Sequence, residues 1–374
     1  LPAGKYNITA IYSGDNKYTP ANETAKFTVD INKNVNLNIS DIVMIYKDGT
    51  RMVAVLTDYK GNPIANATVY FTINGVTYAK TTDANGTASM GLNLLSNIYE
   101  ATVSYNGSDM YDGVSKNITV TINPTILSED ISLMYMDGTS FVAKFLDKSG
   151  KALANTKITF NINGVFYDKV TDADGMAKLG IRLRPDVYIL TAYNPVTGEE
   201  KGFKINVKSL IESSDLTKYY LNESRYEVTL YNKDGSLAVN KTVTFNINGV
   251  FYTKTSDANG VASLGISLRP GEYIITTIFD GLSMGNKVTV LPTLVTHDLT
   301  MKYMDGSRFT VQTLDGQGKA LSNQNVSFNV NGVFYHRTTD SNGMADLLIR
   351  LMPGEYIITS YCNDFQTGNT IKIA

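Results

Sequence analysis

Apolar and polar residues alternate with a period of two along short stretches of the chain, and each stretch ends in a cluster of Gly, Asn, Asp or Pro. This is the period of a β-strand with one buried face, and no stretch shows the period of an amphipathic helix. In the segment that shows the pattern most completely, it predicts strands at 131–136, 141–146, 157–162, 165–170, 176–183, 188–193 and 203–208.

One block recurs four times along the chain. Its copies begin at Phe71, Phe160, Phe245 and Phe328, and each contains Asn-Gly between apolar residues. Asn-Gly in this setting predicts a β-hairpin, because a type I′ turn needs positive φ at both central residues. Each copy continues into a turn of the form Asp-x-Asn/Asp-Gly, which starts at Asp83, Asp172, Asp257 or Asp340. The Asn-Gly asparagines are 89, 85 and 83 residues apart, so the repeated unit is a whole small domain rather than one layer of a solenoid.

A second landmark is a Tyr that follows a Leu-x-Pro-Gly-like corner. It recurs at Tyr6, Tyr188, Tyr273 and Tyr356, with a weaker copy at Tyr99. A Tyr in this place predicts a tyrosine corner, whose hydroxyl ties the corner to nearby backbone. Five corners against four hairpins indicate that the first residues hold only the end of another domain.

The fold class that follows is all-β, with tandem immunoglobulin-like antiparallel β-sandwich domains forming an elongated rod. We predict the C-terminal two strands of a preceding domain at residues 1–31, and Ig-like repeats 1 to 4 at 32–122, 123–208, 209–291 and 292–374. Two strands alone bury too little surface to be stable. Residues 1–31 are therefore either cut from a longer chain or completed by strands of another molecule. The start at Leu1 rather than Met favours a segment of something longer.

The composition of the chain argues against several classes of function and structure. The 33 basic and 35 acidic residues nearly balance, which argues against a nucleic-acid partner. No stretch has the roughly 20 apolar residues of a membrane span. Cys362 is the only cysteine, so no intrachain disulfide forms, and we expect a buried strand residue there.

The chain has few residues that could serve in catalysis or metal binding. The histidines are His297 and His336, without an evident set of nucleophile, base and orienting group, so we predict no catalytic residues, no enzyme activity and no cofactor. The four Asp turns resemble the first half of a calcium loop but lack its later ligands, so we predict plain turns and no metal residues, with calcium left open.

Two kinds of covalent modification are relevant to an exported β-sandwich, an intramolecular crosslink and N-glycosylation. A repeated intramolecular lysine crosslink is disfavoured, because the position before the first-strand Tyr reads Ile45, Met134, Lys218 and Lys302. Asn-x-Ser/Thr sequons predict candidate N-glycosylation sites at Asn7, Asn22, Asn38, Asn66, Asn85, Asn106, Asn117, Asn222, Asn240 and Asn325.

The run DKSGKALANTKITFNINGVFYDKVTDADGMAKLGIRLRPDVYILTAY, residues 147–193, resembles the tandem Ig-like repeats of adhesin-like surface proteins of methanogenic archaea. It is similar, more distantly, to bacterial invasin-type sandwiches. Residues 1–15 with Tyr18 look like the end of another Ig-like repeat of such proteins. The resemblance covers essentially the whole chain and implies an extracellular, cell-surface setting in which the repeats serve as stalks.

The sequence leaves several functions open. The first is a non-enzymatic adhesin-like stalk that presents a binding region away from the cell envelope, with other cells, surface glycans or surface proteins as partners. The alternatives are a fibre or pilus subunit completed by strand exchange between chains, and a glycan-binding module. Residues that diverge between otherwise similar repeats are the places where a binding patch is expected.

Overall fold

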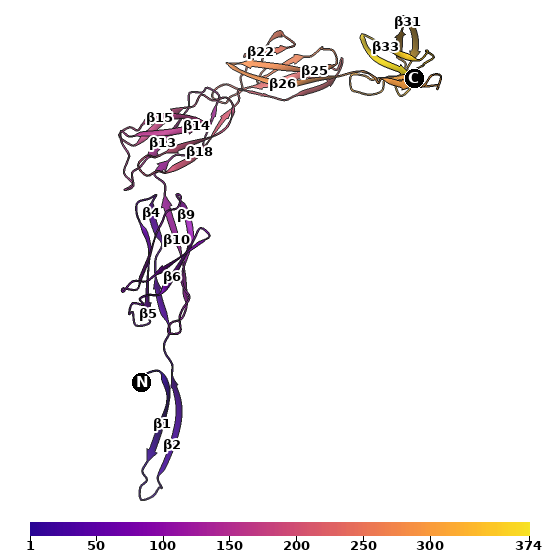
Figure 1. Cartoon of the computed structure of the whole chain (residues 1–374). Coiled ribbons are helices and arrows are strands. Elements are labelled where there is room, and N and C mark those ends of the chain that lie inside the picture. The colour runs from indigo at the N-terminus through magenta and orange to yellow at the C-terminus, as the bar shows by residue number, and fades with distance from the viewer. The chain divides into compact units, whose positions relative to one another are not determined.

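The computed structural model describes residues 1–374 and is built from β-strands and turns (Figure 1). Its contacts divide it into two compact units. Unit 1 comprises Leu1–Ile131, Thr139–Ile181 and Val187–Ile205, and unit 2 comprises Ser132–Gly138, Arg182–Asp186 and Asn206–Ala374. No α-helix has the length and apolarity that crossing a bilayer requires.

The chain opens with an antiparallel hairpin of β1 (Gly4–Tyr12) and β2 (Ala21–Val29), which forms a sheet of two strands. Repeat 1 follows, with β3 (Val35–Asn38), β4 (Ile42–Ile45), β5 (Arg51–Asp58), β6 (Thr68–Ile73), β7 (Val76–Thr81), β8 (Thr87–Gly91), β9 (Asn97–Tyr105) and β10 (Val114–Asn123). Repeat 2 contains β11 (Ile126–Leu127), β12 (Ile131–Met134), β13 (Ser140–Phe145), β14 (Lys157–Ile162), β15 (Val165–Val170), β16 (Met176–Gly180), β17 (Asp186–Tyr193) and β18 (Glu200–Lys208).

The other two repeats have the same eight strands. Repeat 3 contains β19 (Ile211–Ser213), β20 (Leu216–Tyr219), β21 (Arg225–Leu230), β22 (Thr242–Ile247), β23 (Val250–Thr255), β24 (Val261–Gly265), β25 (Gly271–Phe279) and β26 (Leu282–Leu291). Repeat 4 contains β27 (Leu294–Thr296), β28 (Leu299–Met301), β29 (Arg308–Thr313), β30 (Asn325–Val330), β31 (Val333–Thr338), β32 (Met344–Leu348), β33 (Gly354–Cys362) and β34 (Phe365–Ile373).

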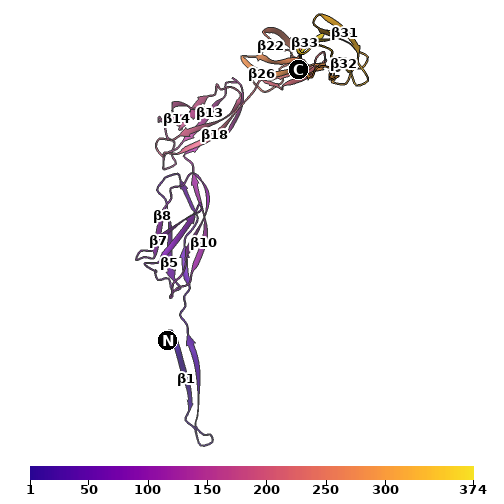
Figure 2. The same cartoon turned by 45° about the vertical axis from the view of Figure 1, so that its right-hand side comes forward.

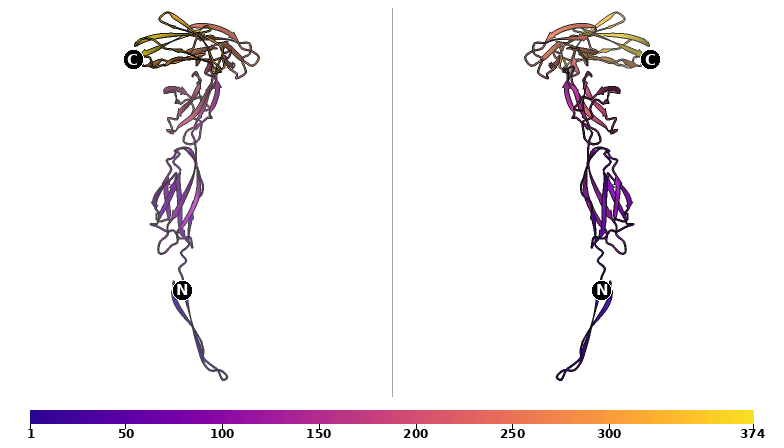
Figure 3. Two further views of the ribbon diagram at one scale, coloured as in Figure 1. Left: turned by 90° about the vertical axis from the view of Figure 1, so that its right-hand side faces the viewer. Right: turned by 90° about the vertical axis from the view of Figure 1, so that its left-hand side faces the viewer.

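Each repeat is a two-layer sandwich, as Figures 2 and 3 show from other sides. In repeat 1 a three-stranded sheet of order β3-β5-β8 faces a five-stranded sheet of order β4-β10-β9-β6-β7, and the other repeats keep this order. The predicted immunoglobulin-like, all-β fold is therefore confirmed. Pairing is antiparallel apart from the early strand of the five-stranded sheet, since β4, β20 and β28 pair in parallel with the last strand of their repeats.

The cores lie between the two sheets. The Phe residues that begin the four repeated blocks, at 71, 160, 245 and 328, are fully buried. In repeat 2 the ring of Phe160 packs edge-on against Phe141 of the other sheet, with ring centroids 5.7 Å apart. The recurring block is thus a packing element, in which the inward positions of one strand carry Phe and Ile.

The predicted turns are present. All four Asn-Gly pairs have positive φ at both residues, for example 53° at Asn163 and 76° at Gly164. The hydroxyls of Tyr6, Tyr99, Tyr273 and Tyr356 each donate to the carbonyl oxygen four residues earlier, at 2.6, 2.9, 2.8 and 2.9 Å. These residues are tyrosine corners.

Some boundaries differ from the sequence prediction. Strand β12 ends at Met134 instead of residue 136, because the chain turns at Met136 with φ of 56°. Strand β16 ends at Gly180, before the predicted end at 183. The short strand β11 was not predicted, since two residues are too few to show a period.

The structure shows that Lys218 and Lys302 are not equivalent residues, although each precedes a Tyr of the predicted first strand. Leu216 pairs with Val288 and Leu299 pairs with Ile371, which places Lys218 at the position of Met301, whereas Lys302 is exposed. Lys218 is buried, and its Nζ donates to the carbonyl oxygens of Ser224 and Ile266 at 3.2 and 2.8 Å. The position before the first-strand Tyr is therefore a core residue at Lys218 and an exposed loop residue at Lys302.

Consecutive repeats contact each other through one recurring feature. The last residue of the short parallel strand lies over a loop glycine of the next repeat. A Cβ at Gly150 would lie 2.8 Å from Cδ1 of Ile45, and one at Gly235 would lie 4.0 Å from Cγ of Met134. A Cβ at Gly318 would overlap the ring of Tyr219. The first contact lies within unit 1, and the other two lie within unit 2.

Candidate functional site

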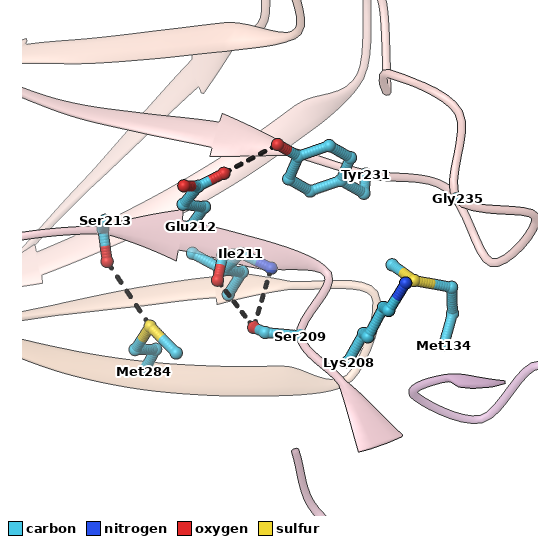
Figure 4. A pocket seen from close by; sticks show the side chains of 9 residues that line it. All are labelled: Met134, Lys208, Ser209, Ile211, Glu212, Ser213, Tyr231, Gly235 and Met284. Atoms are coloured by element: carbon cyan, nitrogen blue, oxygen red, sulfur yellow. Dashed lines mark hydrogen bonds between the residues drawn. The ribbon is translucent and has the colours of Figure 1, made fainter. Parts of the chain in front are cut away.

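A groove of about 540 Å³ lies in unit 2, where the short strand β19 meets the end of β12 (Figure 4). Its lining combines apolar side chains with an acid, a phenol and an amine: Met134, Lys208, Ser209, Ile211, Glu212, Ser213, Tyr231, Gly235 and Met284. This size lies in the range of ligand pockets.

The polar side of the groove follows from the alternation of β19. Ile211 pairs with Leu230 and is buried, so the next residue, Glu212, points outward. Tyr231 follows directly after β21, and its hydroxyl donates to Oε2 of Glu212 at 2.7 Å (Figure 4). That hydrogen bond to a carboxylate raises the pKa of Tyr231 above its ordinary value.

The remaining lining mixes apolar and polar residues and is held by local hydrogen bonds. Ser209 bonds both backbone groups of Ile211, its Oγ accepting from the N–H at 3.0 Å and donating to the carbonyl at 2.6 Å. Ser213 Oγ lies 2.7 Å from Oδ1 of Asn286 and 3.4 Å from Sδ of Met284. The backbone N–H of Tyr135 donates to the carbonyl of Lys208 at 2.9 Å, which holds the β12 turn beside the groove.

The groove has the size of a ligand pocket but no catalytic set. Glu212 and Tyr231 bond each other, and neither serine of the lining contacts a base. His336 lies elsewhere, on the exposed face of repeat 4, where Nδ1 is 2.8 Å from Ser327 Oγ. No hydrogen bond or ion pair joins that serine–histidine pair to a carboxylate, so nothing orients the imidazole as a base.

The carboxylates of the predicted turn aspartates accept hydrogen bonds from backbone N–H groups. Oδ1 of Asp83 accepts from the N–H groups of Asn85 and Thr87 at 2.8 and 2.9 Å, and Asp172, Asp257 and Asp340 do the same. The structure contains no group of three His, Cys, Asp or Glu residues that could hold a metal ion. Cys362 is buried, as expected, and burial raises the pKa of its thiol.

The sequon asparagines are exposed, with one exception. Asn222 is half-buried, and its Nδ2 donates to the carbonyl of Gly316 in the next repeat. A glycan on Asn222 would have to replace this contact, whereas the other nine sites stay candidates.

The groove residues were not among the predicted sites, although the sequence carries a signal for them. The backbone bridges Leu146–Ala152, Tyr231–Leu237 and Leu314–Ala320 are equivalent. Glu212 occupies the strand position that is Leu127 in repeat 2 and Val295 in repeat 4. Repeat 1 has Asn38 and Thr57 at these two positions, so only repeat 3 combines an acid with a phenol there, a divergence that becomes visible once the strands are paired.

No family model matches the chain. It is 22% identical over 397 residues to the inverse autotransporter adhesin YeeJ of Escherichia coli (strain K12), across 88% of this chain and 17% of that protein. The chain thus spans about a sixth of this curated relative. Similar solved structures include invasin, described as a bacterial integrin-binding protein, and a Ca²⁺-stabilised adhesin of an Antarctic bacterium that binds ice. Invasin is 15% identical, across 91% of this chain and 79% of that one, with a TM-score of 0.22. The ice-binding adhesin is 18% identical, across 91% and 99%, with a TM-score of 0.20.

Proposed function

We propose that the chain is a stalk segment of a non-enzymatic, adhesin-like protein of the cell surface, which presents a binding region away from the envelope. The observation that supports this most is the contact that recurs between repeats, where Ile45, Met134 and Tyr219 lie over glycines of the following repeat. Contacts of one kind at successive boundaries suit a chain that must hold its domains in series. The sequence similarity to an inverse autotransporter adhesin supports the same role.

Deletion of whole repeats in the natural, full-length protein tests this proposal. In-frame removal of repeats 2 and 3, at residues 123–291, should leave surface labelling of intact cells unchanged and reduce attachment to other cells. Replacing the deleted stretch with two unrelated Ig-like domains should restore attachment, because a stalk contributes length rather than specific residues. Attachment that stays lost with the replacement domains would contradict a pure stalk. Absence of surface labelling would contradict the location.

Assembly into a fibre by strand exchange is a second candidate. The hairpin β1–β2 is exposed along both strands, and its large apolar side chains Ile8, Ile11, Tyr12 and Tyr18 face solvent. An uncovered pair of strands is a template for further strands. Light scattering at rising concentration tests the idea: growth that Ile8→Lys and Ile11→Lys abolish would support it, and a monomer at every concentration would refute it.

Glycosylation at the exposed sequons and an archaeal source are parts of the proposal, and a structural calcium ion is not. The partners proposed are other cells, or glycans and proteins on their surfaces, without nucleic acid. Mass spectrometry of the protein from its natural host reports on the sequons directly.

A further inference from the structure

A second hollow, of about 590 Å³, lies on the outer face of the five-stranded sheet of repeat 2 and within unit 1. Two aromatic side chains flank it, and small polar side chains form its floor. The lining residues are Thr159, Asn161, Phe166, Thr191, Tyr193 and Glu200.

The strand register fixes this arrangement. Asn161 on β14, which lies between β15 and β17, pairs with Phe166 on one side and with Thr191 on the other. One row along, Thr159 pairs with Tyr193. Phe166 and Tyr193 thus stand on strands β15 and β17, which lie about 10 Å apart because β14 runs between them. That separation leaves room for a flat ring that touches both aromatic side chains.

The aromatic residues are not required by the core. The Phe166 side chain is 71% exposed and that of Tyr193 is 38% exposed. The inward positions of the neighbouring strand β14 and of β17 are filled by other residues, such as Phe160 and Ala192. A large apolar ring that faces water beside a hollow is a feature of binding surfaces rather than of folding.

Comparison with the other repeats shows that the open arrangement belongs to repeat 2. In repeat 4 the equivalent Phe334 and Tyr361 contact each other, with ring centroids 6.0 Å apart. Repeat 3 has Phe251 but an aliphatic partner, Ile278. In repeat 1 the Phe position is Thr77, whose hydroxyl lies 2.8 Å from that of Thr72.

The side chains that line the hollow limit the chemical class of ligand that it can bind. It contains one carboxylate, on Glu200, and no cationic side chain, so it repels polyanions. Asp168 pairs with Thr159 beside the hollow, where its Oδ1 accepts from Thr159 Oγ1 at 2.9 Å and its Oδ2 lies 2.7 Å from Nζ of Lys157. Aromatic faces offer contact to C–H groups, while the Thr and Asn side chains and Glu200 offer hydrogen bonds to hydroxyls. A neutral, flat, polyhydroxylated ring meets all these conditions.

We infer that the Phe166–Tyr193 hollow binds a sugar ring of a neutral polysaccharide. Phe166 and Tyr193 hold the two faces of the ring, and Asn161, Thr191 and Glu200 bond its hydroxyls. For its biological setting this inference rests on the proposed surface function. The binding itself is a property of the isolated chain, so it can fail while the stalk proposal stands, and the reverse also holds.

Native gels that contain one neutral polysaccharide each, namely soluble β-glucan, galactomannan or dextran, test the inference on the full 374-residue chain. At least one should retard the protein, with an apparent affinity reduced on the order of tenfold by Phe166→Ala and by Tyr193→Ala. Phe251→Ala is the matched control, because it removes an equally exposed Phe from a repeat without the aromatic pair, and it should leave retardation unchanged.

Three outcomes would overturn the inference. The first is no retardation in any of the three gels. The second is equal loss of retardation by Phe166→Ala and Phe251→Ala. The third is retardation only in a gel of dextran sulfate, which would indicate a charge interaction. Hydrogen exchange of the β14 and β17 peptides checks that the variants keep the fold, so loss of binding cannot be assigned to unfolding.

Discussion

The hydroxyl of Tyr226 lies 3.2 Å from that of Thr277 inside repeat 3, and repeat 4 has Phe309 and Ser360 at these two positions. Tyr226 also donates to Oδ1 of Asn286 at 2.8 Å. In repeat 4 the phenolic hydroxyl is missing, and Ser360 Oγ is buried without a hydrogen-bond partner. One exchange of Tyr for Phe thus separates a satisfied polar core from one with an unpaired hydroxyl.

This relationship predicts opposite responses in the two repeats. Tyr226→Phe should destabilise repeat 3 by about 1–2 kcal/mol, because Asn286 and Thr277 lose a buried partner. Ser360→Ala should leave repeat 4 unchanged or stabilise it by up to about 1 kcal/mol, because it removes an unpaired polar atom. Hydrogen exchange of the β25 and β33 peptides in the whole chain measures both, with repeat 1 as internal reference. Equal destabilisation of the two repeats would contradict the argument.

Replacing the buried lysine of repeat 3 should stabilise it. Lys218 occupies the position of Met301, so Lys218→Met fits the fold and should add about 1–3 kcal/mol at neutral pH. Lys302→Met is the control, since that lysine is exposed, and it should change stability by less than about 0.5 kcal/mol.

The stability gained by Lys218→Met should become smaller as the pH rises. Burial lowers the pKa of Lys218, so the unfolded chain binds its proton more tightly than the folded chain. The natural chain therefore gains stability as pH rises from the lowered pKa towards the ordinary lysine value near ~10.4. The advantage of Lys218→Met should shrink over that window. Urea midpoints of both chains between pH 7 and 10 measure the difference, and a gap that stays constant would refute the assignment.

A buried carboxylate links repeats 1 and 2 within unit 1. Glu199 Oε2 accepts from Thr125 Oγ1 at 2.7 Å and from the N–H of Ile126 at 3.1 Å, and Oε1 accepts from Ser96 of repeat 1. Glu199→Ala should cost about 3–5 kcal/mol, because several buried donors lose their acceptor. The adjacent, exposed Glu200→Ala should cost less than about 0.5 kcal/mol. Thermal unfolding compares the two; similar midpoints would show that the buried bonds contribute little.

Two loop glycines allow backbone strain to be distinguished from overlap with a side chain of the neighbouring repeat. Gly318 and Gly61 occupy equivalent loops, with φ of 79° and 87°, so Gly→Ala costs about 1 kcal/mol of backbone strain at either site. Only at Gly318 does a Cβ meet another side chain, the ring of Tyr219, whereas nothing lies within 4 Å at Gly61. Gly318→Ala should therefore also raise protease cleavage near Tyr219, and Gly61→Ala should not. Equal cleavage of both variants would remove the proposed contact between repeats 3 and 4.

Calcium should have little effect on stability. The Asp turns use Oδ1 to bind backbone N–H groups, and no group of three acidic or imidazole side chains converges. Melting midpoints with calcium and with a chelator should agree within about 1 °C. Asp257→Ala should lower the stability of repeat 3 by about 1 kcal/mol in either condition, since the turn loses two hydrogen bonds. A midpoint that falls with chelator would indicate a bound ion.

The sequence by itself determined the strands, the Asn-Gly hairpins and the tyrosine corners. Each depends on residues within about ten positions of one another: the period of two, the positive φ that Asn and Gly accept, and a Tyr that reaches back four residues. The same local signals gave the repeat count and the fold class.

Only the tertiary structure decided which side chains come together in the groove of repeat 3 and in the hollow of repeat 2. Glu212 meets Tyr231, and Phe166 faces Tyr193, because sheet order brings separate strands side by side. Tertiary pairing also placed Lys218 in the core, one residue away from where sequence alignment had put it. Sequence spacing reports which face of a strand a side chain takes, but the neighbour across the sheet depends on register and strand order, which the whole chain fixes together.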